Sequence, residues 1–235
     1  MAATPQVNPP EPPVADPTRI TLIRHGESNV TVQRVIGGHR TCSGLSDLGR
    51  RQSERLAQRF DQRLHHPVDV LLSSEFARAA ETAAIIQNAL GVDRVERWAE
   101  FGEHDPGPEL DGITFDEYVD RFGTPDWNGD PHADIFPGGE TTAEFHARVR
   151  SALRRLLEAH AGQHVAVACH GGVVDAVFRM ALGLPVTGGF ALHTLNTSLT
   201  EFVAPGPAED PWRLERYNDA AHLTGLPAAT ERATA

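Results

Sequence analysis

The chain has 235 residues, of which 40% are apolar and 23% charged, and its formal net charge is −11. This length and composition are typical of a soluble globular protein with one large domain or at most two small ones. The negative charge argues against a general nucleic-acid binder, and no apolar run is long enough to cross a bilayer. All 21 basic residues are arginine, which excludes P-loop and Schiff-base lysines.

Residues 1–18 contain six of the 17 prolines and no basic residue, and they lack the apolar core of a signal peptide. We predict that they form a disordered or extended arm, and that residues 226–235 form a loose tail. Residues 19–225 would then be a single domain. The two cysteines, Cys42 and Cys169, are too few for a disulfide scaffold and suit a cytoplasmic location.

The first predicted strand, at residues 20–23, is short and apolar and ends abruptly in Arg24-His25-Gly26. Gly26 lets the chain turn sharply. A neutral imidazole can attack phosphorus, and a neighbouring guanidinium can hold two phosphoryl oxygens at once. Taken alone, the tripeptide is more simply explained as a surface ion-pair partner followed by a turn histidine, so the rest of the chain must decide.

Strands and helices alternate along the chain. The predicted strands lie at 20–23, 68–72, 92–95, 164–169, 198–203 and 212–217. The predicted helices lie at about 46–66, 75–90, 115–122, 141–161 and 171–182, with start signals at Ser73-Ser74 and in the capping box Thr141-x-x-Glu144. This alternation predicts a three-layer α/β/α sandwich with a mostly parallel central sheet.

Basic side chains follow three of these strands. Because the carboxyl ends of neighbouring parallel strands share one edge of a sheet, we expect these side chains to converge there. Helix N-termini would add backbone N–H donors, and the result would be a phosphate pocket that contains a nucleophile. The residues are Arg24, His25, Arg78 and His170, with Gly171 supplying a backbone N–H.

Phosphoryl transfer also needs a proton donor for the leaving oxygen. The irregular stretch 102–139 and its flank offer several carboxylates, and convergence at the sheet edge does not choose among them. The candidates are Glu100, Glu103, Asp105, Glu109 and Asp111.

Several motifs occur in order between residues 19 and 170. They are Arg24-His25-Gly26-Glu27-Ser28, Leu45-Ser46-Asp47-Leu48-Gly49-Arg50-Arg51-Gln52, Ser73-Ser74-x-x-Ala77-Arg78, Glu103-x-x-x-Gly107, Pro137-Gly138-Gly139-Glu140 and His170-Gly171-Gly172. Together they resemble the histidine phosphatase superfamily, the phosphoglycerate mutase-like proteins. Agreement between motifs and predicted structural context makes this resemblance specific.

The resemblance implies a role for each site residue. His25 would be the nucleophile and carry a transient phosphohistidine, while Glu103 would protonate the leaving oxygen and later activate water. Arg24, Arg78 and His170 would bind the phosphoryl group and stabilise its developing charge. The reaction would require no metal and no cofactor. A small phosphorylated substrate and a possible homodimer follow from the same resemblance, with no nucleic-acid or membrane partner.

The chain departs from the family pattern in two places. Many members have Trp-Asn shortly after Arg-His-Gly, where this chain has Val30-Thr31. We expect Asn29 or Thr31 to take over the phosphate contact of the missing asparagine. One extra residue also lies between Gly107 and Gly112, within the segment that would carry the acid.

Three functions remain open at this stage. The leading hypothesis is a phosphatase that hydrolyses a small phosphomonoester through His25. The second is a phosphoglycerate-type mutase, and the third is a catalytically weak protein that binds phosphorylated ligands. Specificity is expected from residues 102–139, whose aromatic side chains either wall the pocket or belong to the core.

Cys169 beside His170 suggests a thiolate nucleophile, but a packed, inert thiol is favoured at the end of a buried strand.

Overall fold

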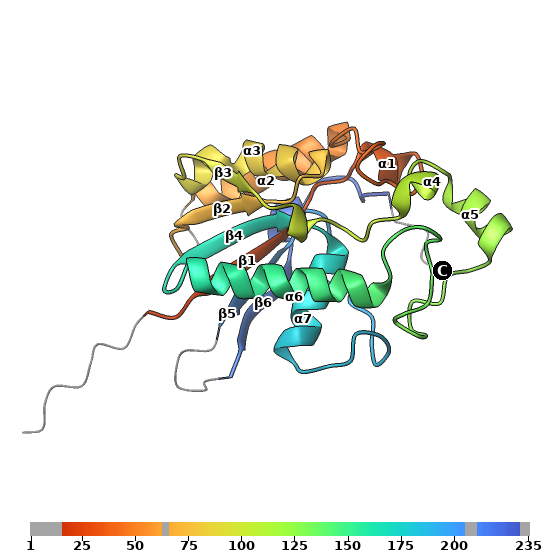
Figure 1. The fold of residues 1–235 in the computed structure, drawn as a ribbon. Coiled ribbons are helices and arrows are strands. Elements are labelled where there is room, and N and C mark those ends of the chain that lie inside the picture. The colour runs from red at the N-terminus through yellow and green to blue at the C-terminus, as the bar shows by residue number, and fades with distance from the viewer. Residues whose placement is uncertain (1–15, 63–65, 205–210, 231–235) are drawn as a thin grey trace, which may run out of the picture.

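The computed structural model describes residues 16–62, 66–204 and 211–230, and it has the predicted α/β/α architecture (Figure 1). The predicted N-terminal arm therefore lies almost entirely outside the described residues, and so do residues 231–235 of the predicted tail. The tail residues that are described return to the domain. The Thr230 N–H donates to Oε1 of the buried Glu27 at 2.6 Å.

A six-stranded sheet forms the centre, in the order β3-β2-β4-β1-β5-β6. The first four strands in this order are parallel, whereas β5 runs antiparallel to β1 and β6 antiparallel to β5. The sheet is therefore mixed, with its parallel part on the side of β3. The strands are β1 (Arg19–Arg24), β2 (Val70–Ser73), β3 (Val95–Arg97), β4 (His164–Cys169), β5 (Leu199–Val203) and β6 (Arg213–Asp219).

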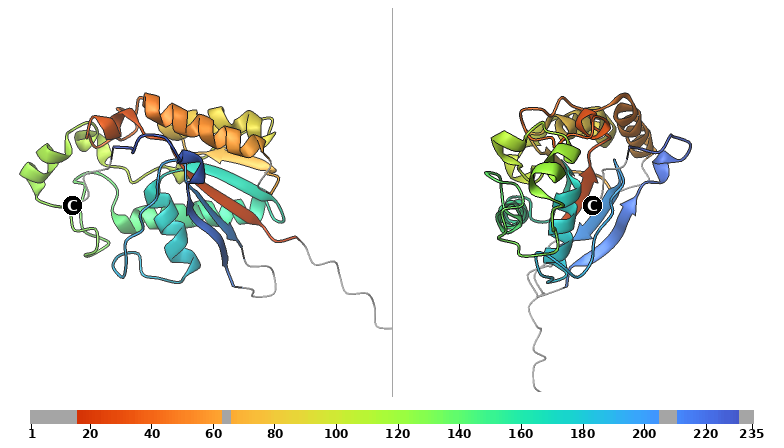
Figure 2. Two further views of the ribbon diagram at one scale, coloured as in Figure 1. Left: turned by 180° about the vertical axis from the view of Figure 1, so that it is seen from behind. Right: turned by 90° about the vertical axis from the view of Figure 1, so that its right-hand side faces the viewer.

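Two pairs of helices cover the two faces of the sheet (Figures 1 and 2). Successive side chains of a strand point to opposite faces, so each strand contributes to both layers. Ile20 and Leu22 of β1 belong to the core cluster of one pair, and Ile23 to that of the other. The pairs are α2 (Asp47–Asp61) with α3 (Ala77–Leu90), and α6 (Thr142–Ala159) with α7 (Gly171–Ala181).

The shorter helices lie beyond the edge at which β1 ends (Figure 1). The three shorter helices include two that contribute Leu110 and Tyr118 to a small third core with Ile135 and Phe136. They are α1 (Asn29–Val32), α4 (Gly107–Leu110) and α5 (Phe115–Phe122), with the 3₁₀ turns η1 (Ala99–Phe101) and η2 (Ala221–Leu223) elsewhere in the chain.

Local signals predicted most helix starts. The capping box before α6 is present, because Thr141 Oγ1 accepts from the Glu144 N–H and the Glu144 carboxylate accepts from the Thr141 N–H. The prediction that Ser73-Ser74 cap α3 is wrong. The N-cap of α3 is Phe76, and the Ser74 hydroxyl bonds to His170 instead.

The third strand also differs from its prediction at 92–95. Gln87 on α3 donates to the carbonyl oxygens of Val92 and Asp93, so this stretch closes the turn after α3. Pairing with β2 begins only at Val95, opposite Leu71.

Strand register places three strand ends at one edge of the sheet. Arg24 pairs with Cys169, and Ser73 pairs with Ala168. His25 and His170 are therefore the first residues beyond two adjacent strands, as the parallel arrangement predicts.

Candidate active site

His25 follows β1 directly and is 2% exposed. Its Nδ1 donates to the carbonyl oxygen of Gly26 at 2.6 Å, since a carbonyl can only accept. On the other side of the ring, Arg78 Nε donates to Nε2 at 3.1 Å. These contacts define a neutral imidazole with its lone pair on Nε2, which is the form that can act as a nucleophile. Gly26 is required here because a Cβ would lie 2.5 Å from the Gly49 carbonyl oxygen.

Arg78, in the first turn of α3, connects the two site histidines and is 1% exposed. Its Nε lies 3.1 Å from His25 Nε2 and 3.3 Å from His170 Nδ1. Because Nδ1 of His170 accepts, its proton is on Nε2, where the Ser74 hydroxyl lies at 2.7 Å. Two imidazole lone pairs therefore face one guanidinium.

Arg24 lies at the end of β1, beside the start of α7. Its Nη1 donates to the carbonyl oxygen of Thr194. A Cβ on Gly171 would lie 3.7 Å from Arg24 Nε, so the first residue of α7 packs against the guanidinium. The loop that contains Thr194 also fixes the backbone beneath the site, because Asn196 Nδ2 donates to the His25 carbonyl oxygen at 2.9 Å.

Glu103 approaches the same helix start from the irregular stretch, and it is 8% exposed. Its Oε2 accepts from the Gly172 N–H at 3.4 Å, and its Oε1 accepts from the His104 N–H at 3.2 Å. A methyl group on Gly172 would overlap Oε1 of Glu103, so the carboxyl group reaches this position only over a glycine. The Glu103 carboxyl group therefore lies at the start of α7, the helix that begins directly after His170.

The arrangement can bind and transfer a phosphoryl group. Two guanidinium groups offer charge and directional donors to its oxygens, and one neutral imidazole offers a lone pair. A carboxyl group on the other side can donate or accept a proton. The start of α7 adds backbone N–H groups whose dipole favours an anion.

The sequence of this chain matches a model of a known family over nearly all of the domain. The model is that of the histidine phosphatase superfamily (branch 1), and it matches residues 20–220. The chain belongs to this superfamily.

Relatives with both phosphatase and mutase names match almost the whole chain. A probable phosphoglycerate mutase GpmB of Yersinia pestis is 31% identical over 220 residues, which cover 91% of this chain and 98% of the relative. An uncharacterized phosphatase PhoE of Bacillus subtilis is 29% identical, with 89% and 98% covered. Among solved structures, a mycobacterial glucosyl-3-phosphoglycerate phosphatase in complex with VO3 has a TM-score of 0.68 at 25% identity, with 86% and 99% covered.

The five candidate carboxylates lie in different surroundings, and the superfamily resemblance implies Glu103 among them. The Glu100 carboxylate pairs with Arg155 at 2.6 Å, and Asp105 Oδ1 accepts from the Gly107 N–H at 2.9 Å. Glu109 is exposed. Of the five, Glu103 is the one that contacts the start of α7.

The fifth candidate, Asp111, anchors the loop that follows α1. Its carboxylate accepts from the backbone of Gly38 at 2.9 Å and of Arg40 at 2.7 Å, and also from the Thr41 hydroxyl. Burial opposes ionisation, but these donors outweigh it and lower the pKa of Asp111. It therefore holds the loop as a carboxylate and is unsuited to be a proton donor.

Asn29 and Thr31, the two predicted replacements for the family asparagine, have partners of their own. Asn29 Nδ2 donates to the Ser43 hydroxyl at 3.3 Å, and Thr31 Oγ1 lies 2.9 Å from the Ser28 hydroxyl. Both residues belong to α1, beside the nucleophile loop. A phosphate contact from either one stays a prediction.

Sequence reasoning missed three contributors to the site. Ser74 was interpreted as a helix cap, yet it bonds to His170. The Gly37 carbonyl oxygen and the Cys42 sulfur each accept from Arg78 Nη1 at 3.3 Å. The position of Ser73-Ser74 at the end of β2 is a sequence signal that could have placed Ser74 in the site. No local sequence pattern links Gly37 or Cys42 to α3.

Cys169 is fully buried at the end of β4. Burial raises the pKa of its thiol to about 12, which leaves no thiolate at neutral pH. The interpretation of Cys169 as a packed, inert thiol is confirmed.

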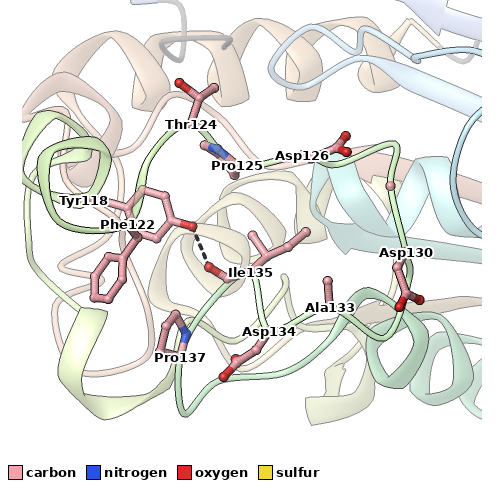
Figure 3. A pocket seen from close by; sticks show the side chains of 11 residues that line it. Tyr118, Phe122, Thr124, Pro125, Asp126, Asp130, Ala133, Asp134, Ile135 and Pro137 are labelled. Atoms are coloured by element: carbon pink, nitrogen blue, oxygen red, sulfur yellow. Dashed lines mark hydrogen bonds between the residues drawn. The ribbon is translucent and has the colours of Figure 1, made fainter.

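A separate hollow of about 300 Å³ lies between α5 and the loop at 124–137 (Figure 3). Tyr118 closes one side and donates its hydroxyl proton to the Ile135 carbonyl oxygen at 2.5 Å. Three aspartates line the hollow and no arginine or histidine does, so it is unsuited to a phosphate. Aromatic side chains of residues 102–139 are expected either to wall the pocket or to belong to the core; Tyr118 and Phe136 belong to a core cluster, and Phe115 packs against it.

Within residues 16–62, 66–204 and 211–230, no group of three or more His, Cys, Asp or Glu side chains is placed to hold a metal ion. None of the helices in these ranges is long and apolar enough to span a bilayer.

Proposed function

We propose that this chain is a phosphatase that hydrolyses a small phosphomonoester through a phosphohistidine on His25. The observation that carries the proposal is the hydrogen bonding of His25: Nδ1 lies 2.6 Å from the Gly26 carbonyl oxygen, and Nε2 accepts from Arg78, which assigns the lone pair to Nε2. A lone pair on a buried imidazole beside two arginines is suited to attack on an anionic phosphoryl group.

The reaction would proceed in two steps. His25 Nε2 attacks phosphorus while the ester P–O bond breaks, and a protonated Glu103 gives its proton to the leaving oxygen, so that an alcohol departs. Glu103, now a carboxylate, accepts a proton from water as the water oxygen attacks the phosphohistidine. The P–N bond breaks, inorganic phosphate leaves, and neutral His25 and protonated Glu103 are restored.

Arg24 and Arg78 would neutralise the phosphoryl oxygens during both steps. For the phosphoryl group to reach His25 Nε2, the Arg78 N–H must move from the imidazole to a phosphoryl oxygen. His170 would support this exchange because its Nδ1 shares the same N–H.

A phosphoglycerate mutase activity is the second candidate, because the Yersinia relative carries that name at 31% identity. A mutase would return the phosphoryl group from His25 to the bound product instead of giving it to water. The two activities share the first step and differ in the second.

The test is phosphate release from a panel of phosphomonoesters in the presence of EDTA. We expect release by the wild type and a loss of about 10³-fold or more in His25→Ala, because the nucleophile is removed. His66→Ala, at an exposed histidine before β2, is the matched control and should retain wild-type activity. Acid-labile radiolabel on the wild-type protein, absent from His25→Ala, would report the phosphohistidine.

The outcomes separate the candidates. Isomerisation of 3-phosphoglycerate without net phosphate release would contradict the phosphatase proposal and support the mutase activity. Binding of phosphorylated ligands with neither reaction would contradict both and leave a binding protein. Release that persists in His25→Ala would rule out the proposed nucleophile.

A further inference from the structure

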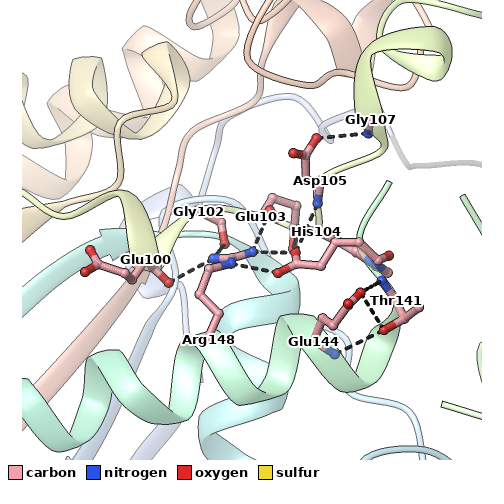
Figure 4. Close-up of polar contacts among 10 residues, drawn as sticks. Glu100, Gly102, Glu103, His104, Asp105, Gly107, Thr141, Glu144 and Arg148 are labelled. Atoms are coloured by element: carbon pink, nitrogen blue, oxygen red, sulfur yellow. Dashed lines mark hydrogen bonds and ion pairs between the residues drawn. The ribbon is translucent and has the colours of Figure 1, made fainter. Parts of the chain in front are cut away.

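Arg148 of α6 uses all five N–H donors of its guanidinium, three on the backbone of residues 100–103 and two on the Glu140 carboxylate (Figure 4). Nε and Nη2 donate to the two carboxylate oxygens of Glu140 at 2.8 and 2.7 Å. Nη1 donates to the carbonyl oxygens of Glu100 at 2.9 Å and Gly102 at 3.2 Å. Nη2 also donates to the carbonyl oxygen of Glu103 at 3.2 Å. One side chain thus binds the backbone before and at Glu103.

Glu140 binds the same segment from its other end. Its backbone N–H donates to the Asp105 carbonyl oxygen at 2.9 Å, and its own carbonyl oxygen accepts from His104 Nε2. Gly139 permits this approach, because a Cβ there would lie 2.6 Å from the Asp105 carbonyl oxygen. Arg148 and Glu140 together therefore hold residues 100–105 on both sides of Glu103.

The Glu103 side chain depends on this backbone support. Two of its hydrogen bonds, from the N–H groups of Gly172 at 3.4 Å and His104 at 3.2 Å, lie beyond and at the upper end of the usual range. The carboxyl group also fits tightly against Gly172, so a small shift of its backbone would move it away from the pocket or into the helix. Misplacement by about 1 Å is enough to cost a large factor in rate.

We propose that Arg148, paired with Glu140, is a positioning residue for the proton-transfer step. It places the Glu103 carboxyl group through the backbone carbonyl oxygens of residues 100, 102 and 103. This inference rests on the proposed function, because it takes Glu103 as the group that protonates the leaving oxygen. Lysine has three N–H donors and no planar fork, so it cannot make the same five contacts.

The same helix supplies a matched control. Arg155 binds the Glu100 side chain at 2.6 Å, and its guanidinium carbon stacks over Trp98 at 3.6 Å. Arg148 likewise lies over an aromatic ring, that of Phe145 at 5.2 Å. Arg155→Ala therefore removes an ion pair and a ring contact from the same neighbourhood without touching the carbonyl oxygens of 102 and 103.

The experiment compares first-turnover release of phenol and p-nitrophenol from their phosphate esters in Arg148→Ala, Arg148→Lys, Arg155→Ala and Glu103→Gln. The p-nitrophenolate anion leaves without protonation, whereas phenolate is more basic and gains from an acid. We expect Arg148→Ala and Arg148→Lys to lose about 10- to 100-fold with phenyl phosphate and less than about threefold with p-nitrophenyl phosphate. Arg155→Ala should change either rate by less than about twofold.

A second readout needs no turnover. The Gly172 amide donates to Glu103, so its NMR resonance should shift in both Arg148 variants and stay in place in Arg155→Ala. Arg148→Lys serves where Arg148→Ala does not fold. Equal loss on both esters, or an unchanged Gly172 resonance, would overturn the positioning role.

Failure of the proposed function has a different pattern. A wild type that releases neither phenol would contradict the phosphatase, while the Gly172 resonance would still decide whether Arg148 places Glu103. Equal loss on both esters in Glu103→Gln would show that Glu103 does not protonate the leaving oxygen. The contacts of Arg148 and Glu140 to residues 100–105, here called the clamp, would then have no catalytic purpose. If Glu103→Gln loses rate mainly on phenyl phosphate but the Arg148 variants do not, the positioning role of Arg148 is overturned and the role of Glu103 as the acid stands.

Discussion

The two sides of the candidate site are built in different ways. The nucleophile side, His25 with His170 and Arg78, comes from two strand ends and the first turn of a helix. The acid side, Glu103, lies in a chain segment after η1 that has no regular structure at that residue. Backbone register positions the first, and side chains from α6 and its N-terminal flank position the second. The half of the candidate site held by strand register (His25, His170 and Arg78) is here called the rigid half, and the half held by side-chain contacts (Glu103) is called the clamped half.

The largest effect should come from the rigid half. Arg78→Ala removes the donor that both imidazoles share, and we expect kcat/KM for p-nitrophenyl phosphate to fall about 10³-fold. The control is Arg51→Ala, an exposed position on α2. Steady-state kinetics measures both variants, and a loss of less than tenfold in Arg78→Ala would show that the two histidines do not depend on it.

The clamped half is probed through adjacent glycines at the start of α7. In Gly172→Ala the new methyl group overlaps Glu103 Oε1, so we expect kcat to fall about 10²-fold as the acid is displaced. In Gly171→Ala the nearest atom, Thr194 Oγ1, is 3.3 Å away, and the loss should be much smaller. Equal kinetics for the two variants would mean that the acid does not sit against Gly172.

A neighbouring pair of serines sharpens the comparison within the rigid half. Ser74→Ala removes the Oγ partner of His170 Nε2, and we expect kcat to fall about tenfold because the ring loses its orientation. The Ser73 hydroxyl is buried and has no hydrogen-bond partner among the described residues, so Ser73→Ala should leave both activity and stability close to wild type. Steady-state kinetics measures kcat for both serine variants, and thermal unfolding measures their stability. A larger loss in Ser73→Ala would contradict the assignment.

The smallest expected effect concerns stability far from the chemistry. Arg59 on α2 holds Asp219 at the end of β6 by two hydrogen bonds and lowers the pKa of that carboxyl to about 2. A lowered folded-state pKa stabilises above the unfolded value of 3.8, and the stabilisation disappears as the pH falls from about 4 to about 2. Asp219→Asn should therefore lose about 2 kcal/mol of unfolding free energy at pH 7 and progressively less over that range.

Denaturant titrations at several pH values measure this loss. Asp47→Asn, whose carboxylate is 92% exposed beside Arg50, is the control and should change stability little. A loss for Asp219→Asn that is constant from pH 7 to pH 2 would contradict the ion-pair explanation.

The contrast between the two halves of the site also explains how much of the structure could be predicted from the sequence. The bounds of β4 and α5 match their predictions, because a buried apolar run and an amphipathic stretch with clear ends need no distant partner. The convergence at the sheet edge follows from parallel pairing alone. The choice of Glu103 as the candidate acid could not be derived from the local sequence pattern, since Glu103 differs from Glu100 and Asp105 only in the residues that lie across from it. Arg148 looked like any charged residue on a helix surface, and its five acceptors lie 8 to 48 residues away in the chain.

The end of the chain has a practical consequence for handling the protein. Glu27, two residues after His25, is 3% exposed, and its carboxylate accepts from the Ser46 hydroxyl and from the Thr230 amide. A purification tag, a shortened expression boundary or exopeptidase trimming that disturbs residue 230 removes one of these two donors. Preparations in which the Thr230 contact is lost are therefore expected to differ from the others at the loop that contains His25.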